Sequence, residues 1–381
     1  MSPRLSKGGC WPTPQQELLL EAAILHGSRA EASWESLNAT ATIDELGWTS
    51  SHLFPQIYRN LEALRIVTPE MDRLKGAYRY TWTRNTRLLQ DIAPLLRTLQ
   101  DAGIDMLMLK DVALATFYYR DYGRRSINEI HVLIRQGQAL RALALLKEMG
   151  CQVPVGSKER LLTVRSCAPV RAGADQLLSL HWRMSGGRNA PNQGATFWDA
   201  ALHTEISGVQ TRVLCATDQL FDVCAQGLCW AVVPPTLWVV DAITILDSVE
   251  SHVDWGRLTA LAAEAQMTLL IGTTLRYIRD AFGAKVPDDV LQGLEANPPS
   301  RGERAEYEAR IHQPAFRRKM RAYWYRYEEL AHGQSLWRKI TGFPGHLQRA
   351  WELEHLWQVL LYAGKLGTQQ LSHAVRGKLS Q

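Results

Sequence analysis

The chain has 381 residues, of which 46% are hydrophobic, with 43 Lys and Arg against 38 Asp and Glu. This length allows two or three domains with ample core, and the composition is that of an ordinary globular protein. The net charge of +5 is too small to indicate a nucleic-acid partner by itself. The most apolar window, 228–246, contains two prolines and Asp241, so it indicates a core segment and no membrane span.

Cysteine usage and the N-terminus indicate a cytoplasmic protein. The six cysteines form no C-x-x-C pair, and several lie in apolar runs, as is typical of reduced, buried thiols. Arg4 and Lys7 are not followed by an apolar segment, so we expect no signal peptide.

Residues 1–103 are expected to form a helical domain that packs on a sheet. Thr13 has the features of an N-cap, because Pro14 stands at the first helical position and Gln16 follows three residues after the cap. We expect Pro94 to break or kink the last helix. The helices are predicted from Thr13 to about Gly27 and over 31–37, 51–64 and 69–103.

Residues 104–216 are predicted to form an α/β core, which makes the protein α+β overall. A short apolar strand over 104–109 ends at Lys110-Asp111 and opens onto a helix. Ligand sites of α/β proteins usually lie at such strand ends. The expected order continues with a strand at 131–134, a helix at 138–150, a strand at 151–153, and strands at 161–167 and 176–184 joined by the loop 168–175.

The residues around this strand end resemble the uncharacterised nucleotidyltransferase family of bacteria, a branch of the polymerase-β-like nucleotidyltransferase fold. In that family a strand ends in Lys-Gly, a helix leads to a Tyr, and a Gly-x-Arg turn precedes an Asp-x-Asp strand. Lys110, Tyr119, Gly123 and Arg125 match this pattern. The segment 179–182, Ser-Leu-His-Trp, aligns with the family's Asp-Leu-His-Trp strand, and the resemblance extends to about residue 287.

Four positions depart from the family pattern. Glu129 and His131 stand where the two metal-binding aspartates belong, Ser179 replaces the third carboxylate, and Asp111 replaces the Gly after the Lys. An imidazole and a hydroxyl are poor ligands for Mg²⁺, which prefers hard oxygen ligands in octahedral geometry. Asp111 would repel a triphosphate unless Lys110 or a metal neutralised it. Asp175 is too far along the strand from Ser179 to replace its carboxylate.

The resemblance implies a site whose residues we expect to share one cavity. Glu129 and His131 are the predicted catalytic residues and metal ligands. Together with His181 they would form a set better suited to Zn²⁺ or Mn²⁺ than to Mg²⁺. An alternative interpretation is that His181 packs the strand against a helix. The predicted nucleotide- or phosphate-binding residues are Lys110, Asp111, Arg125, Ser179 and His181.

The remainder of the chain is predicted to be helical, with a domain at 217–296 and a basic tail at 301–381. This tail has 14 Lys and Arg against 7 Asp and Glu. Its segment 316–327 interleaves basic and aromatic residues. Such a segment could bind phosphate groups of nucleic acid or lipid headgroups, or an acidic peptide, but it also matches a helix that buries its aromatic face. The second interpretation is favoured, and a nucleic-acid partner is not expected.

Two classes of function follow from these features. The first is transfer of a nucleotidyl or other phosphate-linked group to a small-molecule, peptide or protein acceptor, with ATP or another NTP and Mg²⁺ or Mn²⁺, at a degraded metal site. The alternative is a catalytically inactive binding or scaffold protein of the same fold that needs no cofactor. The transfer hypothesis is favoured only narrowly over the binding hypothesis, because a fold does not establish a function.

Overall fold

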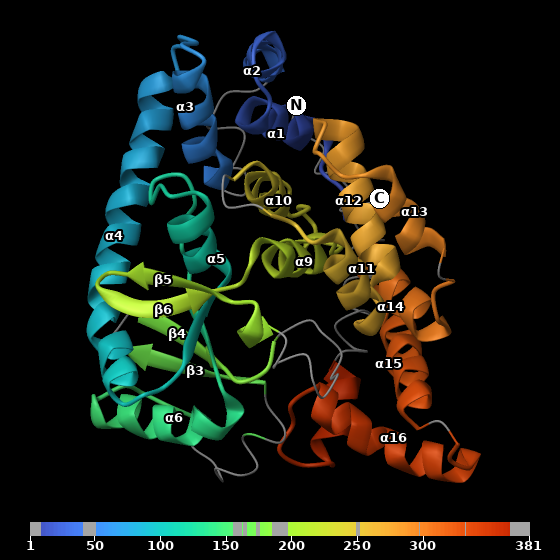
Figure 1. Cartoon of the computed structure of the whole chain (residues 1–381). Helices are drawn as coiled ribbons and strands as arrows, with labels where there is room; N and C mark the ends of the chain where they lie inside the picture. The colour runs from blue at the N-terminus through green and yellow to red at the C-terminus, as the bar shows by residue number, and fades with distance from the viewer. Residues whose placement is uncertain are drawn as a thin grey trace.

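A mixed β-sheet with helices on both faces forms one side of the protein, at the lower left in Figure 1. The computed structural model describes residues 9–40, 51–154, 162, 166–172, 176–184, 197–248, 252–296, 298–331 and 333–365. Within these residues the sheet has six strands in the order β3-β4-β2-β1-β6-β5. The strands are β1 (Met106–Leu109), β2 (Ile130–Ile134), β3 (Cys167–Ala172), β4 (Gln176–His181), β5 (Leu202–Ile206) and β6 (Val209–Val213).

The strand pairing brings the two site-bearing strands, β2 and β4, side by side at the centre of the sheet. β1 pairs antiparallel with β2 and parallel with β6, and β2 pairs parallel with β4. The edge pairs β3/β4 and β5/β6 are antiparallel hairpins. In the registers, His131 of β2 lies between Leu109 of β1 and Ser179 of β4.

The two faces of the sheet pack against different helices. Because successive side chains of a strand point to opposite faces, Met106 and Met108 pack with α4 and α6, whereas Leu107 and Leu109 pack with α9–α12. Figure 1 shows α4 and α6 on one side of the sheet and α9–α11 on the other. The helices between β1 and β3 are α5 (Lys110–Ala113), the π-helical turn η2 (Leu114–Tyr118), the 3-10 turn η3 (Gln136–Gln138) and α6 (Ala139–Glu148).

The N-terminal helices form where they are expected. Thr13 caps the first helix through a capping box with Gln16, which confirms the predicted start. The last helix continues through Pro94 without a break, so the predicted break is wrong. The elements are α1 (Pro14–Ile24), α2 (Ser28–Thr40), the 3-10 turn η1 (Ser51–Leu53), α3 (Phe54–Ala63) and α4 (Met71–Asp101).

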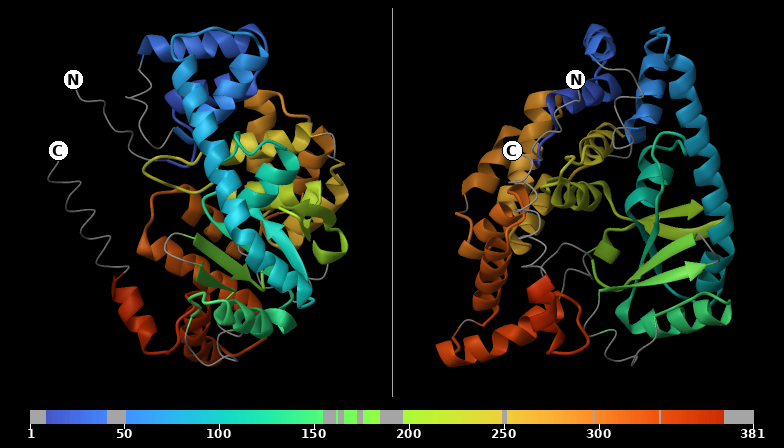
Figure 2. Two further views of the ribbon diagram at one scale, coloured as in Figure 1. Left: turned by 90° about the vertical axis from the view of Figure 1, so that its left-hand side faces the viewer. Right: turned by 180° about the vertical axis from the view of Figure 1, so that it is seen from behind.

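From Ala216 onward the regular elements of the described chain are helices, as predicted. Helices α9–α13 share one hydrophobic cluster with α1, α2 and α3, while α14–α16 extend away from it (Figures 1 and 2). The bounds are α9 (Ala216–Gly227), α10 (Leu237–Asp247), α11 (Trp255–Glu264), α12 (Thr268–Phe282), α13 (Asp288–Ala296), α14 (Arg301–Ile311), α15 (Phe316–Leu330) and α16 (Leu336–Ala350).

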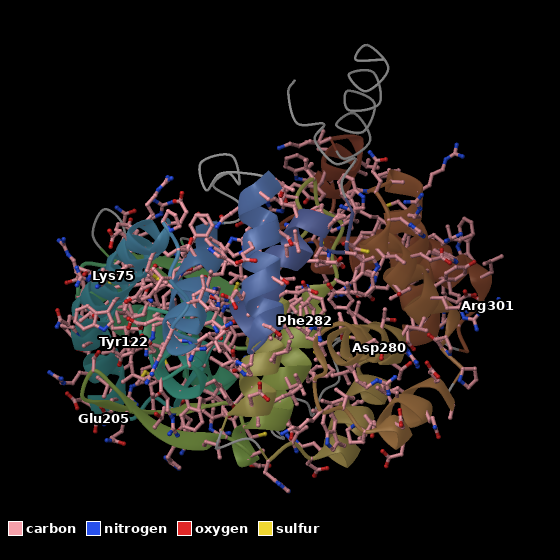
Figure 3. All side chains as sticks on the ribbon, turned by 90° about the horizontal axis from the view of Figure 1, so that it is seen from above. Lys75, Tyr122, Glu205, Asp280, Phe282 and Arg301 are labelled. Carbon is pink, nitrogen blue, oxygen red and sulfur yellow. The ribbon has the colours of Figure 1, made fainter. Side chains whose placement is uncertain are left out.

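Seen from above, the molecule has a sheet half and a helical half. Figure 3 places Lys75 of α4 and Tyr122 in the first half, and Asp280 of α12 and Arg301 of α14 in the second. The predicted domain boundaries near residues 103, 216 and 301 stay predictions. No helix in the described part of the chain is long and apolar enough to cross a membrane.

Two details of the predicted sheet are corrected. β3 occupies Cys167–Ala172, most of the segment expected to be a loop, and the residues 161 and 163–165 of the expected strand lie outside the described residues. The expected strand at 151–153 is reduced to an isolated bridge between Gln152 and Arg171. The β5/β6 hairpin was not predicted, although Ser207 and Gly208 form a two-residue turn with both φ angles positive, which suits a tight hairpin.

Candidate functional site

Lys110 stands at the end of the central strand β1, where the chain turns into α5. The four residues of β1 are buried, and Lys110 itself has a φ of 53°, in the left-handed region that side chains rarely adopt. Its side chain is half-buried, and its ammonium has no hydrogen bond or ion pair with any residue that the structure describes. Backbone strain held at a strand end, beside an unpartnered cation, is typical of a ligand site.

Glu129, His131, Ser179 and His181 contact one another beside Lys110. The Ser179 hydroxyl donates a hydrogen bond to Glu129 Oε1, and His131 Nε2 lies 3.5 Å from Glu129 Oε2. The two imidazoles are joined directly, with His131 Nδ1 3.0 Å from His181 Nε2. The structure therefore brings together Glu129, which precedes β2, His131 of β2, and Ser179 and His181 of β4, the four residues that the sequence singled out.

Both histidines of this cluster are neutral at neutral pH. Burial, followed by the nearby His131 and Lys110, lowers the pKa of His181 from 6.5 to about 3. Burial and Lys110 also lower the pKa of His131. A neutral imidazole has one N–H, so His131 and His181 share their hydrogen bond with one ring as donor and the other as acceptor. Glu129 accepts a hydrogen bond from Ser179, and His131 Nε2 lies beside its other oxygen at 3.5 Å.

The cluster does not fit the Mg²⁺ site that the resemblance implies. Two of the three expected carboxylates are replaced by His131 and Ser179, and both side chains are bonded within the cluster. Among the described residues, no group of three or more His, Cys, Asp and Glu side chains is arranged to hold a metal ion. The metal role expected of Glu129 and His131 stays a prediction.

Arg125 does not point its charge at an open site. It is 6% exposed and binds Asp241 of α10 through Nε at 2.9 Å and Nη2 at 3.1 Å. The same Nη2 lies 3.0 Å from Asp111 Oδ1, and Tyr119 donates to Asp241 Oδ1 at 2.7 Å. Asp111 also accepts from the Asn128 backbone N–H. These contacts favour a structural role for Tyr119 and Arg125 over the phosphate contact expected of Arg125.

The Gly-x-Arg turn that matches the family pattern requires glycine at position 123, because Tyr78 packs closely against it. A Cβ at this position would lie 2.2 Å from Cε2 of Tyr78 on α4. The Tyr78 hydroxyl in turn donates to Asp121 at 2.9 Å. Tyr78 therefore packs against this turn.

Two carboxylates near the site were not recognised in the sequence. Asp222 of α9 is 6% exposed, and burial raises its pKa from 3.8 to about 6, while the nearby Lys110 acts in the opposite direction. Its Oδ1 accepts a 2.7 Å bond from Gln226. Asp241 is equally buried, and burial also raises its pKa. The sequence feature that could have identified both carboxylates is an acidic residue inside an otherwise apolar helical pattern.

Comparisons with known proteins identify a family. The model of a family described as uncharacterised nucleotidyltransferase matches residues 48–283. No curated protein matches the sequence significantly. Three solved structures match parts of the chain. Two show the antibiotic-resistance factor ANT(2'')-Ia, one in solution and one in complex with adenylyl-2''-tobramycin, and both are 13% identical with a TM-score of 0.32. The third is an antigenic nucleotidyltransferase-like protein from Paracoccidioides brasiliensis, 14% identical with a TM-score of 0.33. The matches cover 52%, 50% and 56% of this chain and 95%, 98% and 94% of the respective structures.

Proposed function

Because the chain belongs to the uncharacterised nucleotidyltransferase family, we propose that it binds a nucleotide or another phosphate-bearing ligand at the end of β1. We further propose that the metal-dependent transfer implied by its resemblance has been lost. The observation that carries this proposal is the closed hydrogen-bonded cluster at the metal positions, in which Ser179 bonds Glu129 and His131 bonds His181. These side chains satisfy one another, so a metal would have to break their bonds before it could be ligated.

Charge at the strand end supports anion binding. Lys110 supplies a half-buried ammonium that lacks an acceptor within the described residues, and a lysine binds phosphate as a point charge. Asp111 would repel a phosphate, but its ion pair with Arg125, which also binds Asp241, offsets part of its charge. Arg125 would thus assist binding indirectly, by weakening the repulsion from Asp111.

Transfer of a group without the metal site of the family is the second candidate, and Asp222 favours it. A carboxyl group with a pKa of about 6 can exchange a proton near neutral pH, which is the property a general base requires. The acceptor would be a small molecule, a peptide or a protein. Six cysteines that remain thiols support a cytoplasmic location for either activity.

The test combines ligand binding with a transfer assay on the full chain. We expect ATP to raise the melting temperature with or without Mg²⁺ or Mn²⁺, and a ligand at 100 times its Kd adds about 2.7 kcal/mol. Lys110→Ala should abolish the shift. Lys147→Ala is the matched control, because Lys147 is exposed on α6, which covers the opposite face of the sheet. No labelled nucleotide should be transferred to the chain or to added acceptors.

Two results would contradict the proposal in different ways. If neither ATP nor other phosphate-bearing ligands stabilise the protein, binding at Lys110 is wrong. If a metal-dependent transfer occurs and Glu129→Ala abolishes it, catalysis is retained, and the transfer function replaces the binding function.

A further inference from the structure

The end of the described chain carries large apolar side chains in solvent. On the first two turns of α16, Trp337 is 73% exposed, and in the short helix 358–365 Leu360 is 78% exposed. The other members of this set are 40–67% exposed. We call the set the C-terminal apolar surface; it comprises Leu336, Trp337, Ile340, Leu356, Trp357, Leu360, Leu361 and Tyr362.

The surface belongs to one packed unit, so its exposure is not the result of a missing core. α16 buries Leu347, and the helix 358–365 buries Val359, each to 5% exposure. Tyr362 packs on Trp351 at the end of α16, with ring centroids 4.9 Å apart. Leu336, Trp337 and Ile340 fall within about 100° of one another around the helix, which makes a single apolar face.

The rim of the surface is basic. Arg338 and Arg349 of α16 are exposed, and neither guanidinium has an ion-pair partner among the described residues. Arg349 borders a cavity of about 460 Å³ that Leu356 also lines, so a cation and an apolar side chain share one opening. The tail 301–381 carries 14 Lys and Arg against 7 Asp and Glu. A second copy of the chain would bring two such positive tails together, which opposes self-association through this face.

Exposed Trp, Tyr and Leu beside Arg and Lys are the side chains that occupy a membrane interface. Tryptophan and tyrosine prefer the headgroup level, leucine enters the acyl boundary, and basic residues bind anionic headgroups. α16 and the helix 358–365 are short and present these residues on the outside. They lie at the end of the molecule away from α2 and α3 (Figures 1 and 2).

We propose that the C-terminal apolar surface binds the surface of a lipid bilayer that contains anionic lipids. Leu336, Trp337 and Leu360 would insert at the interface, with Arg338 and Arg349 on the headgroups. The bound chain lies on the bilayer, because no described helix can span it. This proposal is independent of the ligand bound at Lys110.

Vesicle flotation of the full chain tests the proposal. The probes are vesicles of phosphatidylglycerol and phosphatidylcholine in equal amounts, and vesicles of phosphatidylcholine alone. We expect the protein to float with the mixed vesicles, to float less with the neutral ones, and to be released by salt. Trp337→Glu combined with Leu360→Glu should weaken binding at least about tenfold, because it removes two central anchors from the apolar contact.

A matched control distinguishes binding through this surface from nonspecific binding through other exposed apolar residues. Val67→Glu combined with Trp82→Glu changes two exposed apolar residues near the opposite end of the chain, which are 93% and 47% exposed, and should leave flotation unchanged. Circular dichroism should show that both variants fold. Failure of the wild type to float, or equal flotation of the Trp337/Leu360 variant, would overturn the proposal. A dimer that the same variant dissociates would instead identify a second copy as the occupant.

Discussion

Replacing Arg125 by Ala should be among the most destabilising single substitutions in this protein. The side chain is 6% exposed and makes two hydrogen bonds to Asp241, one to Asp111 and one to the carbonyl of Ser126 at 2.8 Å. Its removal leaves Asp241, itself 3% exposed, with only Tyr119 as a partner from this network. Removing one member of a buried ion pair costs about 3–5 kcal/mol, so we expect a loss of this size in the free energy of unfolding.

The loss should grow with pH. Burial already raises the pKa of Asp241, and the Arg125 charge is the largest influence that lowers it. Without Arg125 the pKa rises further above its unfolded value of about 3.9. A carboxyl group with a raised pKa favours folding while it is protonated, and this contribution is lost as the pH rises through the folded pKa. The variant should therefore be closest to the wild type under acid conditions.

Denaturant unfolding followed by circular dichroism measures both effects. Adding Asp241→Asn to Arg125→Ala removes the unpaired charge. The double variant should regain part of the lost stability and should lose most of the added pH dependence. Arg124→Ala is the control, because Arg124 is only partly buried and bonds a single side chain, Gln56. A loss below about 1 kcal/mol for Arg125→Ala, the range of exposed pairs, would refute the structural role.

Three further predictions concern the cluster, the turn and the first helix. The lowered pKa values of His131 and His181 mean that protonation opposes folding, so stability should fall as pH drops from 6.5 toward 3. Replacing both by Gln should flatten this acid limb in pH-dependent melting curves, and an unchanged limb would show that other groups cause it. Gly123→Ala should cost about 1–3 kcal/mol in chemical unfolding through its clash with Tyr78, and Tyr78→Ala should relieve most of that cost. Thr13→Ala removes the capping box and should cost about 1 kcal/mol by the same assay, and no change would mean that the cap is redundant.

The parts of the site that lie close together in sequence could be predicted. A short apolar strand that ends in a charge identified Lys110, and the period of two along a strand placed Ser179 and His181 on one face. The expectation that Glu129, His131 and Ser179 share one site came from the resemblance, and the pairing of β2 with β4 came only from the structure. These inferences needed only local pattern and chain order.

The partners that decide the role of each residue could not be predicted in the same way. Asp241 lies 116 residues from Arg125 and bonds it because α10 packs over the strand end. Asp222 reaches the same region from α9. An acidic residue inside an apolar helical pattern indicates burial, but it does not identify the partner of the carboxylate, so tertiary packing had to be known first.

Tyr119, Gly123 and Arg125 fasten the sheet to α10 and α4. Their contacts are needed whether or not any group is transferred. Without Arg125 the buried charge of Asp241 would be uncompensated, and a side chain at position 123 would clash with Tyr78. A fingerprint built on these three positions therefore selects chains that adopt this architecture. It carries no information about transfer, which in our proposal depends on the side chains at positions 129, 131 and 179.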